Sequence, residues 1–344
     1  MACPTVSRRF LFKLGALLFI LVLYVFGAAF YSGLRLWQRP LTFDGDVRRL
    51  LNRSTWDVVD VLVAASRLEK TTLTLPACPI ISPHLKGPVQ VDNVSTPSFE
   101  SLAAQHPELE AGGLWRPTDC RSRLHVAIIV PYRQREHHLK LFLTHMHPFL
   151  QRQQLDYGIY IVDQALPTRF NRAMLMNIGY AEASKQANYS CYIFHDVDLL
   201  PEDDRNIYSC PDQPRHMSVA VDKFKYRLIY STLFGGVTAF KTEHFKLING
   251  FSNIFFGWGG EDDDLRQRVD HHHLSVLRYP MTIARYVMVK HTREKLNAAN
   301  RQRVEMLRHS KERFDTDGLN SLQYDLLKLE KRPLYTWVYA WIHE

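Results

Sequence analysis

Short apolar runs alternate with segments of helical periodicity in the middle of this chain. The apolar runs are Val126–Val130, Tyr157–Val162 and Tyr192–Phe194, and the helical segments are Glu136–Leu150 and Asn171–Gln186. Strands that alternate with helices in this way favour βαβ units with right-handed crossovers. The pattern therefore predicts an α/β domain built around a mainly parallel sheet.

A D-x-D motif, Asp196 and Asp198, follows the third apolar run directly. Residues i and i+2 of an extended segment point the same way, so both carboxylates can face one metal ion, or one metal ion and one ribose hydroxyl. Ligands of open α/β sheets bind at the carboxyl ends of the strands. The motif indicates a hard divalent cation held against a phosphorylated substrate, while a turn or a helix cap is the structural alternative.

Met288 and His291 are candidates to complete the shell of the cation with Asp198. A thioether beside an imidazole and a carboxylate is unusual for Mg²⁺ or Ca²⁺, so the set favours Mn²⁺.

Basic residues follow the first two predicted strands. Arg133 and Arg135 come after the first, and Phe170 and Arg172 come after the second. Guanidinium groups at this edge suit a diphosphate or the edge of a uracil. Surface salt bridging is the alternative.

A glycine-rich turn precedes four consecutive acids, Glu261 to Asp264. One or two acids would compensate a helix dipole. Four repel one another, which raises their pKa values and suits a general base. Trp258 lies between Gly257 and Gly259, which indicates a stacking platform on a closing loop.

The N-terminal region predicts a membrane anchor. The segment 14–34 carries no charge and is long enough to span a bilayer. It is preceded by the basic residues Arg8, Arg9 and Lys13. We expect a cytoplasmic tail at 1–13, a signal-anchor at 14–34, a stem at 35–75 and a lumenal catalytic domain at 76–344. A signal peptide cleaved near Gly27–Ala29 is the alternative. Both place the rest of the chain in the secretory lumen.

The five cysteines agree with an oxidising compartment. Cys3 precedes the anchor, and the other four form an even set. Three pairings of these four are open, and proximity in the sequence favours Cys78–Cys120 and Cys191–Cys210.

Three triplets, at Asn52, Asn93 and Asn188, fit the pattern for N-glycosylation. Lys and Arg are scattered despite the net charge of +8, so no nucleic-acid partner is expected.

Residues 76–120 are predicted to be loop. Short strands are predicted over Met217–Val221 and Gly236–Phe240, and a final helix over Ala298–Phe314.

The sequence resembles the β-1,4-galactosyltransferase family of Golgi glycosyltransferases over roughly residues 76–320. The matching stretches include VAIIVPYRQREHHL, FNRAMLMNIGY, FHDVDLLPEDDRNIY, FGGVTAF and GFSNIFFGWGGEDDDLRQRV. The resemblance implies a GT-A fold, a UDP-sugar donor, Mn²⁺, inversion at the anomeric carbon and both disulfides named above.

The resemblance also implies roles for single residues. Asp262 is the expected catalytic base, and the metal ligands are Asp198, Met288 and His291. The expected donor contacts are Pro131, Arg133, Arg135, Phe170, Arg172, Asp196, Val197, Phe224, Leu233, Trp258 and Arg293. The expected acceptor contacts are Trp258, Gly260, Glu261, Asp262, Asp263 and Arg303.

One position departs from the galactose-transferring members, which usually carry Tyr where this chain has Leu233. Leucine resembles the small aliphatic residue of the invertebrate β-1,4-N-acetylgalactosaminyltransferases. We therefore expect a type II Golgi membrane enzyme that transfers GalNAc from UDP-GalNAc to a terminal GlcNAc. The alternatives are the same transfer from UDP-Gal, or a lumenal lectin or partner subunit without turnover. An accessory protein or a second copy of the chain is also open as a partner.

Overall fold

The computed structural model describes residues 75–290 and 295–344. The described residues belong to one compact unit, Thr74–Glu344. The predicted tail, anchor and almost the whole stem lie outside the described residues. Within the described ranges, no helix has the length and apolar character needed to cross a bilayer.

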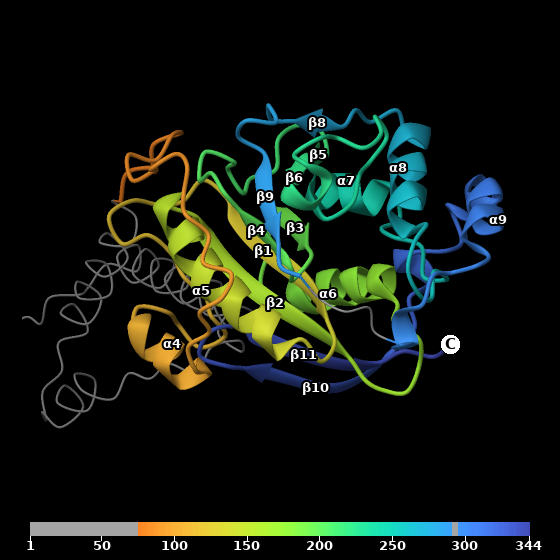
Figure 1. Cartoon of the computed structure of the whole chain (residues 1–344), viewed down its shortest axis with the longest axis horizontal. Helices are drawn as coiled ribbons and strands as arrows, with labels where there is room; N and C mark the ends of the chain where they lie inside the picture. Colours follow the sequence, from red (N-terminus) through yellow and green to blue (C-terminus); the bar gives the residue numbers. More distant parts are fainter. Residues whose placement is uncertain (1–74, 291–294) are drawn as a thin grey trace, which may run out of the picture. The chain divides into compact units, whose positions relative to one another are not determined.

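An eight-stranded sheet forms the centre of the domain (Figure 1). Its four middle strands, β11, β2, β1 and β3, run parallel, whereas β10 and β7 run antiparallel to their neighbours. The prediction of a mainly parallel sheet therefore holds for the middle only, and the whole sheet is mixed. The strands in sheet order are β10 (Asp325–Lys331), β11 (Thr336–Trp341), β2 (Asp156–Gln164), β1 (His125–Tyr132), β3 (Cys191–His195), β7 (Val237–Lys241), β5 (Arg215–His216) and β8 (Leu277–Arg278).

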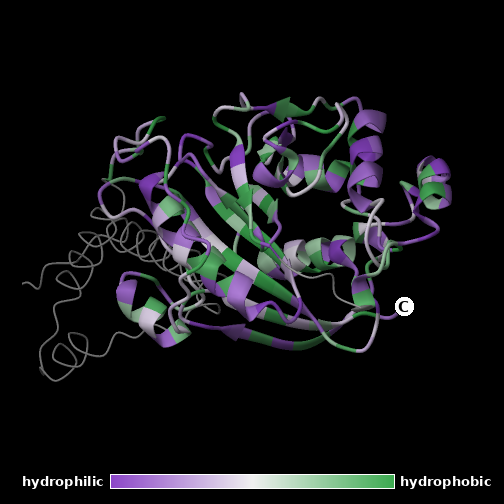
Figure 2. Ribbon diagram, in the orientation of Figure 1, coloured by the Kyte–Doolittle hydropathy of each residue, from purple (hydrophilic) through white to green (hydrophobic). Residues whose placement is uncertain are grey.

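The alternation of side chains along β1 builds two cores, one on each face of the sheet. Val126, Ile128 and Val130 pack in the same cluster as α5 (Glu136–Arg152). Ala127 and Ile129 pack with α6 (Arg172–Gln186) in the other cluster. Because both faces are covered, β1 is a continuous apolar run, and Figure 2 shows the inner strands as hydrophobic.

A second sheet of three short strands lies beside the end of β3, in the order β4-β9-β6. β4 (Leu199–Pro201) begins immediately after Asp198, and Leu199 pairs with Met288 at the end of β9 (Arg285–Met288). β6 covers only Ala220–Val221, so the strand predicted over Met217–Val221 is shorter than expected. The small sheet brings two distant segments of the chain together.

The remaining helices are mostly short. They are α4 (Phe99–Gln105), η1 (Asp222–Phe224), α7 (Thr242–Leu247), α8 (Glu261–His271), η2 (Lys295–Asn297), α9 (Arg303–Arg308), η3 (Ser310–Arg313) and η4 (Leu319–Ser321). α4 corrects the prediction that residues 76–120 are only loop. Its N-cap is Ser98, whose hydroxyl accepts from the N–H of Ser101.

The final helix predicted over Ala298–Phe314 is wrong as a continuous element. Ala298 and Asn300 instead form backbone hydrogen bonds with Trp258, at 2.9 Å each. These long-range bonds hold the segment extended, so the helix begins only at Arg303. The helical pattern of the sequence is overridden by pairing with a distant loop.

Both predicted disulfides are confirmed. Cys78 is bonded to Cys120, and Cys191 is bonded to Cys210. The second bond links the start of β3 to the segment that precedes β5, and the first fixes the beginning of the domain to residues just before β1.

We expect the longer loop to contribute more stability, because the loop-closure entropy removed from the unfolded chain grows with loop length. The bonds span 19 and 42 residues of sequence separation. Replacing both cysteines of the shorter pair by Ser should cost about 3 kcal/mol of unfolding free energy, and the same change in the longer pair about 4 kcal/mol. Urea denaturation followed by tryptophan fluorescence measures both. If both variants lost the same amount of unfolding free energy, below about 1 kcal/mol, the loop-entropy account would be contradicted.

Candidate active site

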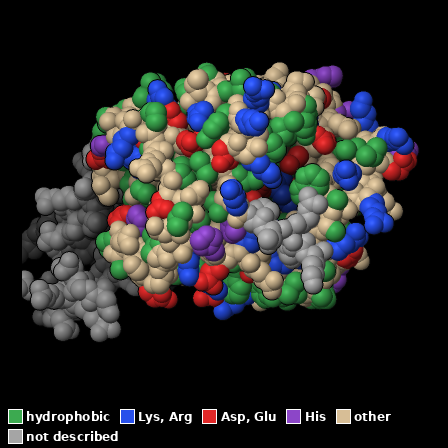
Figure 3. Space-filling view, viewed as in Figure 1, with side chains coloured by type: hydrophobic (Ala, Val, Ile, Leu, Met, Phe, Trp, Pro, Cys, Tyr) green, Lys and Arg blue, Asp and Glu red, His purple; other side chains and the backbone are tan. Residues whose placement is uncertain are grey.

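A cavity of about 240 Å³ opens at the carboxyl edge of the parallel strands. Acidic and basic side chains meet in a hollow of the face seen in Figure 3. Twelve of the residues predicted from the sequence line the cavity: Pro131, Arg133, Arg135, Phe170, Arg172, Asp196, Val197, Asp198, Trp258, Glu261, Asp262 and Met288. The structure thus brings most of the predicted donor, metal and acceptor positions to one place.

Two further residues line the cavity but were missed by the sequence analysis, Lys223 and Asn297. Both belong to single-turn 3₁₀ helices, η1 and η2. Lys223 comes shortly after the short strand predicted over Met217–Val221, but a single lysine there looks like any surface residue, and Asn297 follows no predicted strand. Their place is decided by the loops that carry them.

Five predicted residues do not line the cavity, namely Phe224, Leu233, Gly260, Asp263 and Arg303. Phe224 packs against the core cluster that contains β1. Asp263 accepts a hydrogen bond from the hydroxyl of Tyr230 at 3.1 Å. Two more predicted residues, His291 and Arg293, lie outside the described residues.

Arg172 is the hub of the site. It starts α6, and its Nε donates to Oδ1 of Asp196 at 2.6 Å. Its Nη1 donates to Oδ1 of Asp262 at 2.7 Å and lies 3.8 Å from Oε1 of Glu261. One guanidinium therefore joins the end of β3 to the start of α8. The several donors of a rigid, planar guanidinium allow one Arg to bridge two carboxylates, which the single ammonium of Lys does less well.

The pKa values of these carboxyls report the same crowding. The pKa of Asp262 is raised to about 8, chiefly by burial, against the pull of Arg172 and with a contribution from the negative charge of Glu261. Burial likewise raises the pKa of Asp196 to about 6 against the pull of Arg172. Burial would lower the pKa of Arg172, but the surrounding carboxylates raise it above its ordinary value. Arg172 is therefore a fixed positive charge beside two aspartates, Asp196 and Asp262, whose pKa values are raised.

Glycines let Asp262 sit where it does. Gly260 precedes α8 with φ at +102°, a conformation that side chains rarely allow. A Cβ on Gly235 would lie 2.1 Å from Oδ2 of Asp262. The Asp262 side chain, 28% exposed, consequently packs against bare backbone at its back and opens to the cavity at its front.

Glu261 is the more buried neighbour of Asp262 and lies at the first position of α8. Its Oε2 is buried and accepts no hydrogen bond from the described residues. A buried carboxylate oxygen with unused acceptor capacity, at the wall of a cavity, is suited to accept a hydrogen bond from a hydroxyl or amide group of a bound molecule.

The small sheet positions the predicted metal ligands. The N–H of Val289 donates to the carbonyl of Asp198 at 2.8 Å, and the N–H of Met288 donates to Oδ1 of Asp222 at 2.8 Å. Asp198 is nearly buried, and its Oδ2 lies 4.0 Å from Nη1 of Arg135. Among the described residues no three His, Cys, Asp or Glu side chains form a metal-binding group. The third predicted ligand, His291, falls in the gap 291–294.

Arg133 and Phe170 form one wall of the cavity. Arg133 is buried, its Nη1 donates to the carbonyl of Thr168 at 2.8 Å, and its guanidinium lies 4.9 Å from the centre of the Phe170 ring. These contacts hold a flat cationic and aromatic surface, which suits a planar base next to an anion.

Trp258 is 52% exposed and also lines the cavity, and the N–H of the preceding Gly257 donates to the carbonyl of Phe170 at 2.7 Å. The backbone of Trp258 is held by the 2.9 Å hydrogen bonds with Ala298 and Asn300, so the exposed indole projects from a fixed point of the loop. Such an exposed ring on a braced backbone fits the predicted stacking platform.

Comparison with known proteins shows which family this chain resembles. Residues 78–211 match the N-terminal region of glycosyl transferase group 7, and residues 215–292 match the N-terminal domain of galactosyltransferase. The chain is 51% identical over 264 residues to β-1,4-galactosyltransferase 1 of Mus musculus, which covers 77% of this chain and 66% of the mouse protein. It is 47% identical over 277 residues to β-1,4-galactosyltransferase 4 of Cricetulus griseus, which covers 80% of both.

Solved structures agree with the α/β fold. The catalytic domain of Drosophila β1,4-galactosyltransferase 7 in complex with xylobiose has a TM-score of 0.56 and 31% identity, over 64% of this chain and 95% of that chain. A mutant of that enzyme, in complex with manganese, UDP-Gal and xylobiose, has a TM-score of 0.56 and 30% identity over the same shares.

The two family matches extend together from residue 78 to residue 292 and include the D-x-D, the glycine-rich turn and the acidic start of α8. The cavity lies at the carboxyl edge of the same region. The sequence identity, the fold and the residues of the cavity lead to one conclusion: the chain belongs to the β-1,4-galactosyltransferase family of glycosyltransferases.

Proposed function

We propose that this protein transfers GalNAc from UDP-GalNAc, with inversion, to O4 of a terminal β-linked GlcNAc. The observation that carries the transfer is the pairing of Asp262 with Arg172 in a cavity shared with Asp198 and Met288. A base, a fixed cation and two metal-ligand candidates then surround one space. A lectin without turnover has no need of a carboxyl whose pKa is raised to about 8.

Asp262 acts as the base in this proposal. It takes the proton from the acceptor hydroxyl while that oxygen attacks the anomeric carbon and the diphosphate leaves from the opposite face of the sugar. Arg172 holds the carboxylate in place through Nη1 at 2.7 Å. Glu261, with its unused buried oxygen, accepts a hydrogen bond from the acceptor and orients it.

Asp198, Met288 and His291 would hold Mn²⁺. A carboxylate and a thioether at the ends of paired strands fit this borderline cation better than Mg²⁺. The structure of the Drosophila relative with manganese and UDP-Gal supports the assignment. When bound, the ion supplies Lewis-acid stabilisation of the diphosphate, and Arg135 adds positive charge at the same wall.

The donor choice rests on Leu233. Leu233 does not line the cavity itself, but it stands between Tyr230, whose hydroxyl reaches Asp263, and Gly235, which touches Asp262. Its carbonyl also accepts from Nη2 of Arg278 at 2.8 Å. The loop that carries Leu233 is thus held next to the acidic start of α8, through Tyr230 and Gly235, and Arg278 fixes its backbone.

The same transfer from UDP-Gal is the second candidate. It is favoured by the names of the relatives, which are galactosyltransferases. The two candidates share the base, the metal and the acceptor, and differ only in whether the site accepts the N-acetyl group of the donor.

A Golgi location with a type II anchor is part of the proposal. Its support is the pair of disulfides, which form and persist in oxidising compartments, together with the apolar residues 14–34.

Removing the base tests the mechanism. Asp262→Asn should lower kcat by about 10²- to 10⁴-fold, because the amide cannot accept the proton. Binding of the donor, measured by calorimetry with UDP and Mn²⁺, should change little. If donor affinity collapses while kcat survives, Asp262 belongs to the donor side, and Asp263 becomes the candidate base.

The raised pKa of Asp262 predicts the pH dependence. The base works as the carboxylate, so kcat/KM for the acceptor should rise with pH. Its midpoint should lie well above the ordinary aspartate value of about 4. Glu261→Gln removes a negative neighbour that raises this pKa, so the midpoint should move down. A profile whose midpoint is the same in both proteins would show that another group is titrating.

Gly235→Ala should displace Asp262 without unfolding the domain. The new Cβ would lie 2.1 Å from Oδ2 of Asp262, and the end of that side chain can move where backbone could not. We expect kcat to fall by about tenfold or more, since a misplacement of about 1 Å can cost about a hundredfold, with little change in Tm. Gly158→Ala is the control for an added methyl group, because its Cβ would also meet side chains, those of Tyr189, Leu114 and Tyr160, none of which lines the cavity. Full activity of Gly235→Ala would remove Asp262 from the role of base.

Leu233→Tyr tests the donor. The family resemblance puts residue 233 next to the 2-substituent of the donor sugar; leucine there leaves room for the acetyl methyl, worth about 0.8 kcal/mol, and avoids an overlap that costs about 1–3 kcal/mol. The GalNAc-to-Gal ratio of kcat/KM should therefore drop roughly ten- to several-hundred-fold in the variant. Both donors are assayed with one GlcNAc acceptor, with Mn²⁺ and with a chelator. If the wild type prefers UDP-Gal, the second candidate is correct; an unchanged ratio would exclude Leu233 as the determinant.

A further inference from the structure

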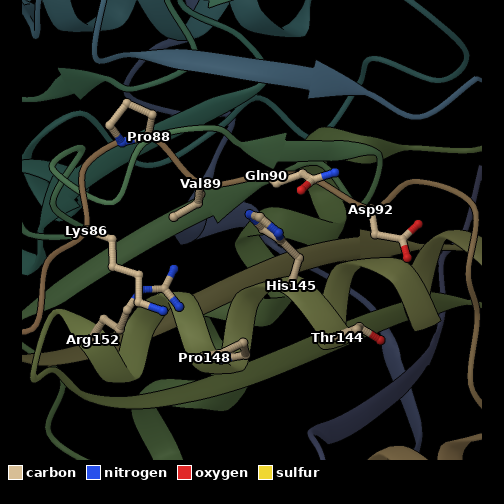
Figure 4. A pocket seen from close by; sticks show the side chains of 9 residues that line it. All are labelled: Lys86, Pro88, Val89, Gln90, Asp92, Thr144, His145, Pro148 and Arg152. Atoms are coloured by element: carbon tan, nitrogen blue, oxygen red, sulfur yellow. The ribbon is translucent and has the colours of Figure 1, made fainter.

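A second cavity, of about 390 Å³, shares no residue with the candidate active site. It lies between the segment 86–92 and the helix α5 (Figure 4). Polar side chains from both walls line it, among them Gln90, Asp92, Thr144 and His145. Pro88 and Pro148 add apolar surface from opposite walls.

The walls of this groove are fixed by buried contacts. The N–H groups of Lys86 and Gly87 donate to the carboxylate of Asp204, which is fully buried, and Nε of Arg152 donates to it at 2.7 Å. The N–H of Val89 donates to the carbonyl of Glu202 at 2.8 Å. The groove is therefore a preformed feature and not a gap under a loose loop.

The groove ends at an exposed acceptor triplet. Asp92 lines the groove, and the next residues are Asn93, Val94 and Ser95. All four are exposed, and Oδ1 of Asp92 accepts from the N–H groups of Val94 and Ser95 at 2.9 and 3.0 Å. This turn keeps Asn93 at the surface directly beside the groove.

Asn188 is in a different situation, although its triplet has the same pattern. Its neighbour Tyr189 is 2% exposed, and the N–H of Ser190 donates to the carbonyl of His125 at 3.0 Å. Asn188 and Ser190 are exposed like Asn93, but the buried Tyr189 and the Ser190 N–H tie this triplet to the start of β1 and β3, whereas all three residues of the Asn93 triplet are exposed in a turn. Asn52 lies outside the described residues.

We propose that Asn93 carries an N-linked glycan whose first sugars lie in the groove between residues 86–92 and α5. The disulfides indicate the oxidising compartment in which N-glycans are added. Hydroxyl and acetamide groups of the sugars find partners in Gln90, Asp92 and Thr144, and the apolar faces of the sugar rings meet the two prolines. The glycan is tethered at the mouth of the groove, so it occupies the groove at a high effective concentration.

Glycan occupancy is tested on the full chain secreted or membrane-bound in mammalian cells. Enzymatic release of N-glycans in H₂¹⁸O converts an occupied Asn to ¹⁸O-labelled Asp, which peptide mass spectrometry locates. The label should appear at position 93 and vanish in both Asn93→Gln and Ser95→Ala, while Asn188→Gln, the matched control, keeps it. An unlabelled peptide around Asn93 would overturn the proposal.

The seat of the glycan is tested by hydrogen exchange of the native protein before and after enzymatic release. Release should remove protection from the peptides that contain residues 86–92 and Thr144, and should leave the peptide of β10 unchanged. If position 93 is glycosylated and exchange does not change, the glycan projects into solvent and the groove is not its seat. Sugar transfer should persist in Asn93→Gln, so this result is independent of the proposed donor and base.

Discussion

The ion pairs of Arg172 hold the candidate active site together. Arg172 begins α6, and its guanidinium binds Asp196 after β3 and Asp262 in α8. Each partner is brought there by a different part of the chain. Removing one member of a partly buried ion network leaves uncompensated charge, which commonly costs about 3–5 kcal/mol. The position of the base and the arrangement of three elements are therefore set by one side chain.

This network can form because the sheet leaves its carboxyl edge open. Both faces of β1 are covered, by α5 on one side and α6 on the other, so the edge is the place where polar side chains reach solvent. The small sheet adds a second constraint at the same edge, since Leu199 pairs with Met288. Apolar burial supplies the stability, and backbone pairing supplies the geometry of the site.

Local patterns predicted the elements well where burial and periodicity agree. The strands β1, β2 and β3 and the helices α5 and α6 appear within a few residues of the predicted ranges. The pattern failed where distant pairing decides the conformation. Ala298 and Asn300 pair with Trp258, which shortened the predicted final helix, and Lys223 and Asn297 enter the cavity on single-turn helices that no periodicity marks.

The sequence by itself determined the order of strands and helices, the chemical groups that follow each strand, and, through family resemblance, the cysteine pairs and the residues of the site. Only the tertiary structure decided that the sheet is mixed, that Gly235 touches Asp262 and that Arg172 pairs with it. The reason is physical. Periodicity and residue type act over a few positions, whereas the pKa of Asp262 depends on burial and on charges that lie far away in the sequence and meet only after folding.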